Sequence, residues 1–213
     1  MSETPEVPDP AAAAPVTGAA PGAADSPVAP AVAPAVASGA VPAPVPDGAP
    51  EAPAAEAGVP FTVPSEYEAA LGRVVKLAER ELLVFDRDCK EGGWNGVARH
   101  AALRDFLLGH RDARFTLIVH ETRFIEAHVP RLLMLLREFP HKLAILRTTD
   151  ESRDLTEGWA IADARHALLR FHFDYCRGEA KLDAPQAART LRGRFLAVAE
   201  RPEPGLNATL LGL

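Results

Sequence analysis

A guanidinium, an imidazole and a carboxylate alternate along one apolar segment of the sequence, at Arg170, His172 and Asp174. Strand side chains point alternately to two faces, so these three would share one face while the leucine and phenylalanines between them face the core. Such a set can bind a phosphate group through charge-assisted hydrogen bonds. Arg177 and Glu179 follow in what we expect to be a glycine-containing loop. The sequence favours either a phosphate-binding pocket here or a polar strand face in which Asp174 pairs with an arginine.

This polar row lies on the second strand of a predicted hairpin. Residues 159–162 and 167–173 are rich in apolar and aromatic residues, and a polar Asp-Ala-Arg-His turn separates them. Aspartate is favoured in turns because its carboxylate binds nearby backbone N–H groups, so Asp163 is interpreted first as a turn residue. Together with the polar row, Asp163 completes the candidate ligand-binding set.

A second group of carboxylates follows the other predicted strands. Asp86 and Asp88 come directly after one apolar run, and Asp150 follows another. Ligands of open α/β sheets bind outside the carboxyl ends of the strands, where these residues would lie. The segment LLVFDRDC resembles the first motif of haloacid dehalogenase-type phosphatases, in which one aspartate attacks phosphorus, the second acts as the acid and magnesium lies between them. This resemblance implies, as an alternative, a magnesium-dependent phosphohydrolase that uses Asp86 and Asp88, although the family's late acidic pair is missing.

Short apolar strands alternate with helical segments ahead of the hairpin, and one helix follows it. Strands separated by a helix are typical of parallel βαβ units, to which the hairpin adds antiparallel strands. We therefore expect an α/β fold with a mixed, mostly parallel sheet and flanking helices. The expected elements are a helix at 65–79, a strand at 82–85, a helix at 97–109, a strand at 115–120, a helix at 130–139, a strand at 142–147, the hairpin, and a helix from 184 or 185 to 200.

Composition divides the chain into three parts. Residues 1–60 contain 20 Ala and 14 Pro, no Lys, Arg or aromatic residue, and seven acidic residues, which predicts a disordered tail. We expect one folded domain at 64–200 and a second tail at 201–213. All 23 Lys and Arg lie after residue 60, against 22 acidic residues, so the domain is nearly neutral. This balance argues against a strongly basic nucleic-acid surface but leaves a local patch open.

Only two cysteines, Cys89 and Cys176, are present, too few for a disulfide framework, and no Cys/His spacing suggests zinc. The proline-rich start does not resemble a signal peptide, and no stretch reaches 18 apolar residues. We therefore expect a cytoplasmic protein without a membrane span. No cofactor is expected.

The element order, three strand–helix units followed by a hairpin with Asp163 at its turn and a closing helix, resembles one repeat of the phospholipase D superfamily. Its signature is His-x-Lys-x4-Asp followed by a later Glu, and here Asp163 and Glu179 take the Asp and Glu positions. Counting back from Asp163, the nucleophilic His falls on Thr156 and the phosphate-binding Lys on Gly158. Neither residue can perform those roles. The chain is also similar to an uncharacterised proteobacterial family related to this superfamily.

The resemblance implies an inactive relative, that is, a non-catalytic module that binds a phosphate-bearing ligand or a protein partner. Single-copy members of the superfamily pair through the edge that carries the motif, so a homodimer is a further expectation. The resemblance extends over roughly residues 81–200 and rests on element order more than on identities.

Overall fold

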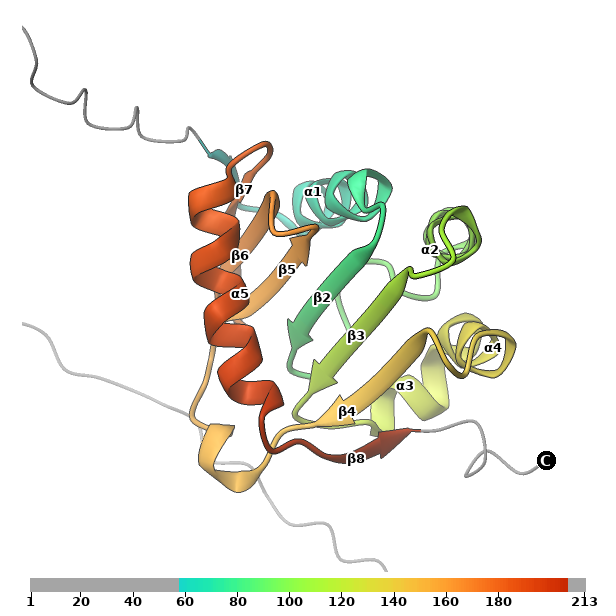
Figure 1. The fold of residues 1–213 in the computed structure, drawn as a ribbon. Coiled ribbons are helices and arrows are strands. Elements are labelled where there is room, and N and C mark those ends of the chain that lie inside the picture. Colours follow the sequence, from blue (N-terminus) through green and yellow to red (C-terminus); the bar gives the residue numbers. More distant parts are fainter. Residues whose placement is uncertain (1–57, 207–213) are drawn as a thin grey trace, which may run out of the picture. The chain divides into compact units, whose positions relative to one another are not determined.

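Eight strands form one mixed sheet in the order β1-β7-β6-β5-β2-β3-β4-β8 (Figure 1). The structure is a computed structural model that describes residues 58–206. β2, β3 and β4 are parallel, and the pairings on both sides of them are antiparallel. The mixed α/β fold expected from the sequence is confirmed, but only two of the seven strand pairings within residues 58–206 are parallel, so the sheet is not mostly parallel as predicted. The strands are β1 (Val59–Phe61), β2 (Glu81–Asp86), β3 (Arg114–Val119), β4 (Leu143–Arg147), β5 (Gly158–Ala162), β6 (His166–His172), β7 (Tyr175–Lys181) and β8 (Glu203–Leu206).

The two faces of the sheet are covered unequally. Four helices pack on one face, whereas α5 alone crosses the other, over β6, β5 and β2 (Figure 1). β2, β3 and β4 follow one another in one direction across the sheet, so crossovers of one hand bring their helices to the same face. The helices are α1 (Pro64–Leu77), α2 (Val97–Gly109), α3 (Arg123–His128), α4 (Pro130–Glu138) and α5 (Pro185–Ala199), with a short 3₁₀ turn, η1, at Asp150–Ser152.

The larger core lies between the sheet and α1 to α4. Leu71, Leu103 and Leu135, one from each of three helices, are fully buried against Phe115 of β3. Prolines begin both α1 and α4, where the missing N–H has no intrahelical partner to lose. None of the helices among residues 58–206 has the length and apolar character needed to cross a membrane.

The smaller core lies under α5. The rings of Phe85 and Trp159, from adjacent strands, stack with centroids 4.7 Å apart. Ala188 and Phe195 of α5 are buried over them. Aromatic pairs of this kind add about 0.5–1.5 kcal/mol to the burial of their area. This core fixes β5 beside β2, which decides where the hairpin places its polar residues.

The predicted hairpin is present as β5 and β6. Three residues, 163–165, connect the strands. Asp163 lies at φ 53° and Ala164 at φ 51°, and the N–H of Arg165 donates to the carbonyl of Ala162 at 2.9 Å. Two successive positive φ values are those of a type I′ turn, which matches the twist of antiparallel strands. The register pairs Trp159 with Leu169.

The expected loop after the hairpin is wrong, because Arg177 and Glu179 belong to strand β7. This strand shows no apolar alternation, since Cys176, Gly178 and Ala180 are the small residues that face α1. A Cβ on Gly178 would collide with the Leu169 carbonyl oxygen of β6 and the Phe61 ring of β1. Only glycine at this position lets both neighbouring strands lie this close to β7. Because β7 consists of small and polar residues, hydrophobic periodicity in the sequence does not predict it.

The prediction for Phe171, on the strand face opposite the polar row, is also wrong. Phe171 was expected to face the core, but 45% of it is exposed. The pairing of β6 with β7 changes register between Arg170 and His172, so strict alternation does not continue to the end of the strand.

Two short strands lie outside the range 64–200 expected for the domain. β1 pairs with β7, and β8 pairs with β4, so the two form the outer edges of the sheet. Strands of three and four residues are too short to show a period. Residues 1–57 and 207–213, which make up most of the two expected tails, lie outside the described residues.

Candidate functional site

The strand ends define two edges of the sheet. The carboxyl edge is the edge at which β2, β3 and β4 end and β5 begins. Its strand ends are Asp86 of β2, Val119 of β3, Arg147 of β4 and Gly158 of β5. The opposite edge, the amino edge, begins at Glu81 on β2. Because Gly158 pairs with Arg170, the end of β6 also lies at the carboxyl edge. Two groups of polar residues that are distant in sequence therefore meet there.

Asp86 is the most deeply buried carboxylate at this edge, with 4% of the residue exposed. Burial raises its pKa from 3.8 to about 6, and the neighbouring Asp88 adds to the increase while Arg170 opposes it. The backbone N–H of Asp88 makes a long contact of 3.4 Å with Asp86 Oδ1. The same burial raises the pKa values of the nearby Tyr67 phenol and Cys89 thiol well above their usual range. Cys89 is thus a buried thiol without the lowered pKa that reactive cysteines need.

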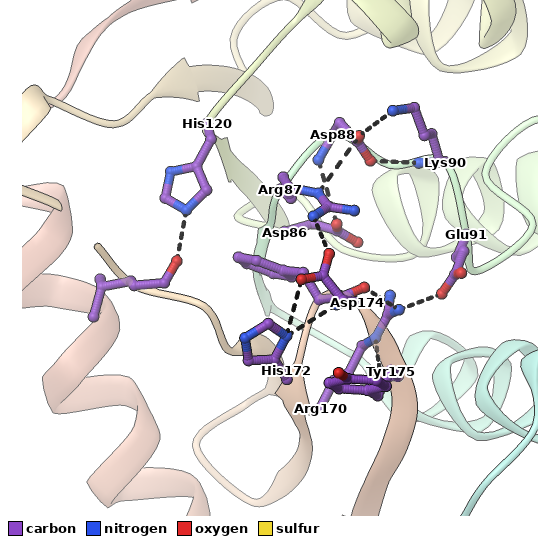
Figure 2. Close-up of polar contacts among 12 residues, drawn as sticks. Asp86, Arg87, Asp88, Lys90, Glu91, His120, Arg170, His172, Asp174 and Tyr175 are labelled. Carbon is purple, nitrogen blue, oxygen red and sulfur yellow. Dashed lines mark hydrogen bonds and ion pairs between the residues drawn. The ribbon is translucent and has the colours of Figure 1, made fainter. Parts of the chain in front are cut away.

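Arg170 is held by several internal partners (Figure 2). It is 3% exposed, and it donates to the carbonyl of Phe173 at 2.5 Å and to that of Tyr175 at 3.1 Å. Its guanidinium pairs with Glu91 at 2.5 Å and lies 5.2 Å from the centroid of the Tyr67 ring. A buried arginine held in this way fastens the β6–β7 connection to the loop after β2, and it has little capacity left for a ligand.

Cations and carboxylates at the mouth of the site also pair with one another (Figure 2). Arg87 donates to Asp174 at 2.6 Å, and Lys90 lies 2.8 Å from Asp88. The hydrogen bond from Arg87 lowers the pKa of Asp174. The Nδ1 of His172 accepts the backbone N–H of Asp174 at 3.1 Å. The polar row therefore behaves as the paired strand end that was one of the two sequence interpretations.

The space left between these groups is small. The cavity has a volume of about 50 Å³ and is bounded by both walls of the site, with Phe173 closing one side. Sites for small organic ligands usually measure about 300–1,000 Å³. This cavity can hold water but not a phosphate ester.

His120 joins three segments beside this site. Its Nε2 donates to the carbonyl of Leu155 at 2.8 Å, and its Nδ1 lies 2.8 Å from the hydroxyl of Thr148. A carbonyl only accepts, so the proton is on Nε2 and the Thr148 hydroxyl donates to Nδ1 in the neutral ring. The ring also meets Phe85 and Phe173 edge-on. His120 thus fixes the segment that leads into β5.

A family model matches residues 63–208, which covers nearly all of the described domain. The chain belongs to the family described as "Domain of unknown function (DUF7931)". No curated protein matches the sequence.

The DUF7931 fold is similar to several solved structures. TrmBL2, an archaeal chromatin protein described as showing a novel mode of DNA binding, is 11% identical with a TM-score of 0.52, over 71% of this chain and 56% of that one. NucT from Helicobacter pylori is 12% identical (TM-score 0.48; 70% and 99% covered). Nuc from Salmonella typhimurium, a phospholipase D family member, is 10% identical (TM-score 0.47; 70% and 99% covered). At these identities the likeness to TrmBL2 concerns the fold, and the chain spans only about half of TrmBL2.

The predicted ligand-binding set does not converge in the DUF7931 domain. Asp163 lies beyond the amino edge, where its carboxylate accepts the backbone N–H groups of Glu79, Arg80 and Glu81 at 2.7–2.8 Å. Arg177 and Glu179 lie on either side of Gly178, the register partner of Arg170. Glu179 lines a pocket with Leu169 and residues of α5. This arrangement agrees with the interpretation of Asp163 as a residue that hydrogen-bonds backbone.

The alternative metal site is not assembled either. Asp150 lies in η1, where it is 92% exposed and pairs with Arg153 at 3.0 Å. No three His, Cys, Asp or Glu side chains within residues 58–206 are grouped so that they could hold a metal ion. Asp86 and Asp88 do lie together, as the sequence suggested, but without a third ligand.

The positions given by the phospholipase D signature lie at the carboxyl edge. The carbonyl of Thr156 accepts the N–H of Phe173 at 2.7 Å, which closes the end of the hairpin. A Cβ added to Gly158 would lie 3.4–3.5 Å from Phe173, Arg170 and Phe85. Side chains of this domain thus fill the space next to the two positions.

Sequence reasoning missed Glu91 and Tyr67, the two remaining neighbours of Arg170. Glu91 stands in a loop with two glycines at positive φ, Gly92 and Gly93, and nothing in that loop points to a distant arginine. Tyr67 looks like an ordinary core residue of a helix. Only the pairing of β2 with β5 brings these groups together.

Proposed function

We propose that this chain is a non-catalytic, phospholipase D-like module that binds a protein partner. The element order and the position of Asp163 support the likeness to that superfamily, and Thr156 and Gly158 stand where its His and Lys would act. The charged groups around Asp86 and Arg170 pair with one another, and the cavity of about 50 Å³ between them cannot admit a phosphodiester. This part of the carboxyl edge therefore supports a structural use in place of bond cleavage.

The exposed end of the β6–β7 hairpin is the surface that we assign to the partner. Tyr175 is 69% exposed, Phe171 is exposed as well, and both lie at the same end of the hairpin as the exposed Arg177. Aromatic residues and arginine are enriched at the centre of protein interfaces. These exposed aromatic side chains, beside a polar site whose charges are paired, are the single observation that carries the proposal.

Site-specific photo-crosslinking in cells tests the surface. A photoreactive residue at position 175 should capture one defined partner, which includes a second copy of this chain, and Phe171→Asp should abolish that product. Met134 on α4 is an exposed apolar residue of similar size and serves as the control position. Capture at 134 equal to that at 175, or a product that survives Phe171→Asp, would contradict the assignment.

A phosphodiesterase assay tests the non-catalytic part. We expect no turnover of bis(p-nitrophenyl) phosphate or of single- and double-stranded DNA by the purified chain. Light scattering on the same material shows whether the partner is a second copy. Turnover above a preparation of Arg170→Met would show that catalysis has survived.

A magnesium-dependent phosphohydrolase is the second candidate, favoured by one observation. Asp86 and Asp88 lie together at the end of β2, where the resemblance to haloacid dehalogenase-type phosphatases places the nucleophile and the acid. Hydrolysis of p-nitrophenyl phosphate that needs magnesium and is abolished by Asp86→Asn would favour this candidate over the binding module.

A further inference from the structure

A second and much larger cavity lies at the carboxyl ends of β3 and β4. Its volume is about 560 Å³, within the range of small-molecule sites. We propose that it binds the phosphate monoester of a small hydroxylated molecule, such as a sugar phosphate. We call it the arginine cavity, and its lining residues are His120, Glu121, Thr122, Arg123, Glu126, Arg147 and Arg153.

The three arginines come from three different segments and keep donors available. Arg123, at the start of α3, is exposed, and no hydrogen bond or ion pair joins it to another residue within 58–206. Arg147, at the end of β4, uses one terminal nitrogen for Glu203 at 2.7 Å, while its Nε is buried without a hydrogen-bond partner. Arg153 pairs only with the highly exposed Asp150, a contact that solvent and salt weaken.

Three guanidinium groups around one cavity fit a phosphate. The planar fork of arginine donates two parallel hydrogen bonds to phosphate oxygens, which a point charge cannot do. The Nε of Arg147 is buried, so the terminal nitrogens of the three arginines are the donors that a phosphate in the cavity would reach.

The remaining lining residues indicate what the phosphate is attached to. Glu121 and Glu126 repel a bare anion but accept hydrogen bonds from hydroxyl groups, and Thr122 can donate or accept. His120 is the only ring in the lining, and both of its nitrogens are already bonded, so the cavity offers no phenyl or indole face on which a base could stack. These features favour a phosphorylated polyol over a nucleotide or free phosphate.

The wall of this cavity is held rigidly before a ligand arrives. His120 forms hydrogen bonds with the Thr148 hydroxyl and with the Leu155 carbonyl. These bonds connect the residue after β4 to the segment that precedes β5. The N–H of Thr148 also donates to Val119 at 3.0 Å. A binding site built on fixed strand ends loses little conformational entropy on binding.

Isothermal titration of the full chain tests this inference with glucose 6-phosphate, glycerol 3-phosphate, glucose and inorganic phosphate. We expect a phosphorylated polyol to bind at least ten times more tightly than glucose or inorganic phosphate. Arg123→Ala should weaken that binding at least tenfold without unfolding, because no hydrogen bond or ion pair joins Arg123 to another residue within 58–206. Arg111→Ala, an exposed arginine in the turn before β3, should leave binding unchanged.

Absence of binding by both phosphorylated polyols would overturn the inference, and so would binding that Arg123→Ala leaves intact. Inorganic phosphate that binds as tightly as the esters would overturn the assignment of the glutamates to hydroxyl groups. These outcomes are separate from the hairpin crosslinks, because the arginine cavity does not include Phe171 or Tyr175.

Discussion

At the amino edge of the sheet, the carboxylate of Asp163 accepts three backbone N–H groups at 2.7–2.8 Å. At the carboxyl edge, the carboxylate of Asp86 is buried beside Arg170, and its one backbone contact with Asp88 is 3.4 Å long. The first aspartate joins the β5–β6 turn to the start of β2. The second is held in an environment that raises its pKa to about 6.

The difference between the two edges lies in what surrounds each charge. Asp163 supplies the acceptor for three backbone N–H groups that would otherwise be unpaired, so its hydrogen bonds contribute to folding. Burial around Asp86 penalises its ionised form, so this charge costs stability that the rest of the fold must supply. Ionisable groups with strongly shifted pKa values are more common at functional positions than elsewhere in a fold, which favours the carboxyl edge over the amino edge as a functional region.

Removal of Arg170 should have the largest effect. Arg170→Met keeps most of the stem but leaves Glu91 and two carbonyls without their donor, and it removes the cation next to Asp86. We expect a loss of about 3–4 kcal/mol in the free energy of unfolding. Urea unfolding can be followed by fluorescence, because Trp94 and Trp159 are both buried.

Arg177→Met on the neighbouring strand is the matched control for Arg170→Met and should change the free energy of unfolding little, since Arg177 is exposed. Equal effects of the two substitutions would show that the Arg170 contacts do not stabilise the carboxyl edge.

Removal of the Asp163 carboxylate should have the next largest effect. Asp163→Ala leaves three backbone N–H groups without an acceptor and places alanine at φ 53°, so we expect a loss of about 2–3 kcal/mol. Asp163→Asn tolerates the positive φ and keeps an acceptor oxygen, so it should lose less. Urea midpoints of the two variants measure this ranking, and an asparagine variant as unstable as the alanine variant would contradict the role of the conformation.

Asp86→Asn should change how stability depends on pH. The pKa of Asp86 is about 6 in the folded state and 3.8 for an unperturbed aspartate, which stands for the unfolded state. Between these two pH values the folded state binds a proton that the unfolded state has lost. The contribution of Asp86 to the free energy of unfolding therefore falls as the pH rises from 4 to 6. Above pH 6 the ionised carboxylate costs roughly 2–3 kcal/mol. The stability of Asp86→Asn relative to the natural chain should therefore increase from pH 4 to pH 7. A constant difference across that range would show that Asp86 is not penalised by burial.

The smallest effect is expected at an exposed ion pair of the amino edge. Arg165 contacts Asp183 at 2.5 Å, but both side chains are mostly in solvent. Exposed pairs of this kind usually contribute little, so Arg165→Ala should leave the urea midpoint unchanged within error. A clear loss of stability that disappears in 1 M NaCl would show that the amino edge depends on surface charge as well as on Asp163.

Most of the framework could be predicted from the sequence because its signals are local. Apolar runs predicted β2 to β6, and apolar residues at helical spacing predicted the main helices. β1, β7 and β8 carry no such signal, because two are very short and β7 consists of polar and small residues that pack only in the presence of Phe61 and α1.

The candidate site was predictable only in pieces. The sequence indicated Asp86 and Asp88 at a strand end, and separately Arg170 with His172 on the hairpin. It could not show that β5 lies beside β2 with Phe85 opposite Trp159, which is a long-range packing decision. That pairing brings Arg170 to Asp86 and sends Asp163 to the other edge.

The order of the strands also determines how the domain responds to mechanical tension. β1 and β8, the first and last strands, occupy opposite outer edges of an eight-stranded sheet, about 34 Å apart at the usual spacing between strands. A pull applied through the two flanking segments acts largely across the strands and loads the interstrand hydrogen bonds a few at a time. The short outer strands would detach first and at low force, while the three parallel strands and their helices remain intact.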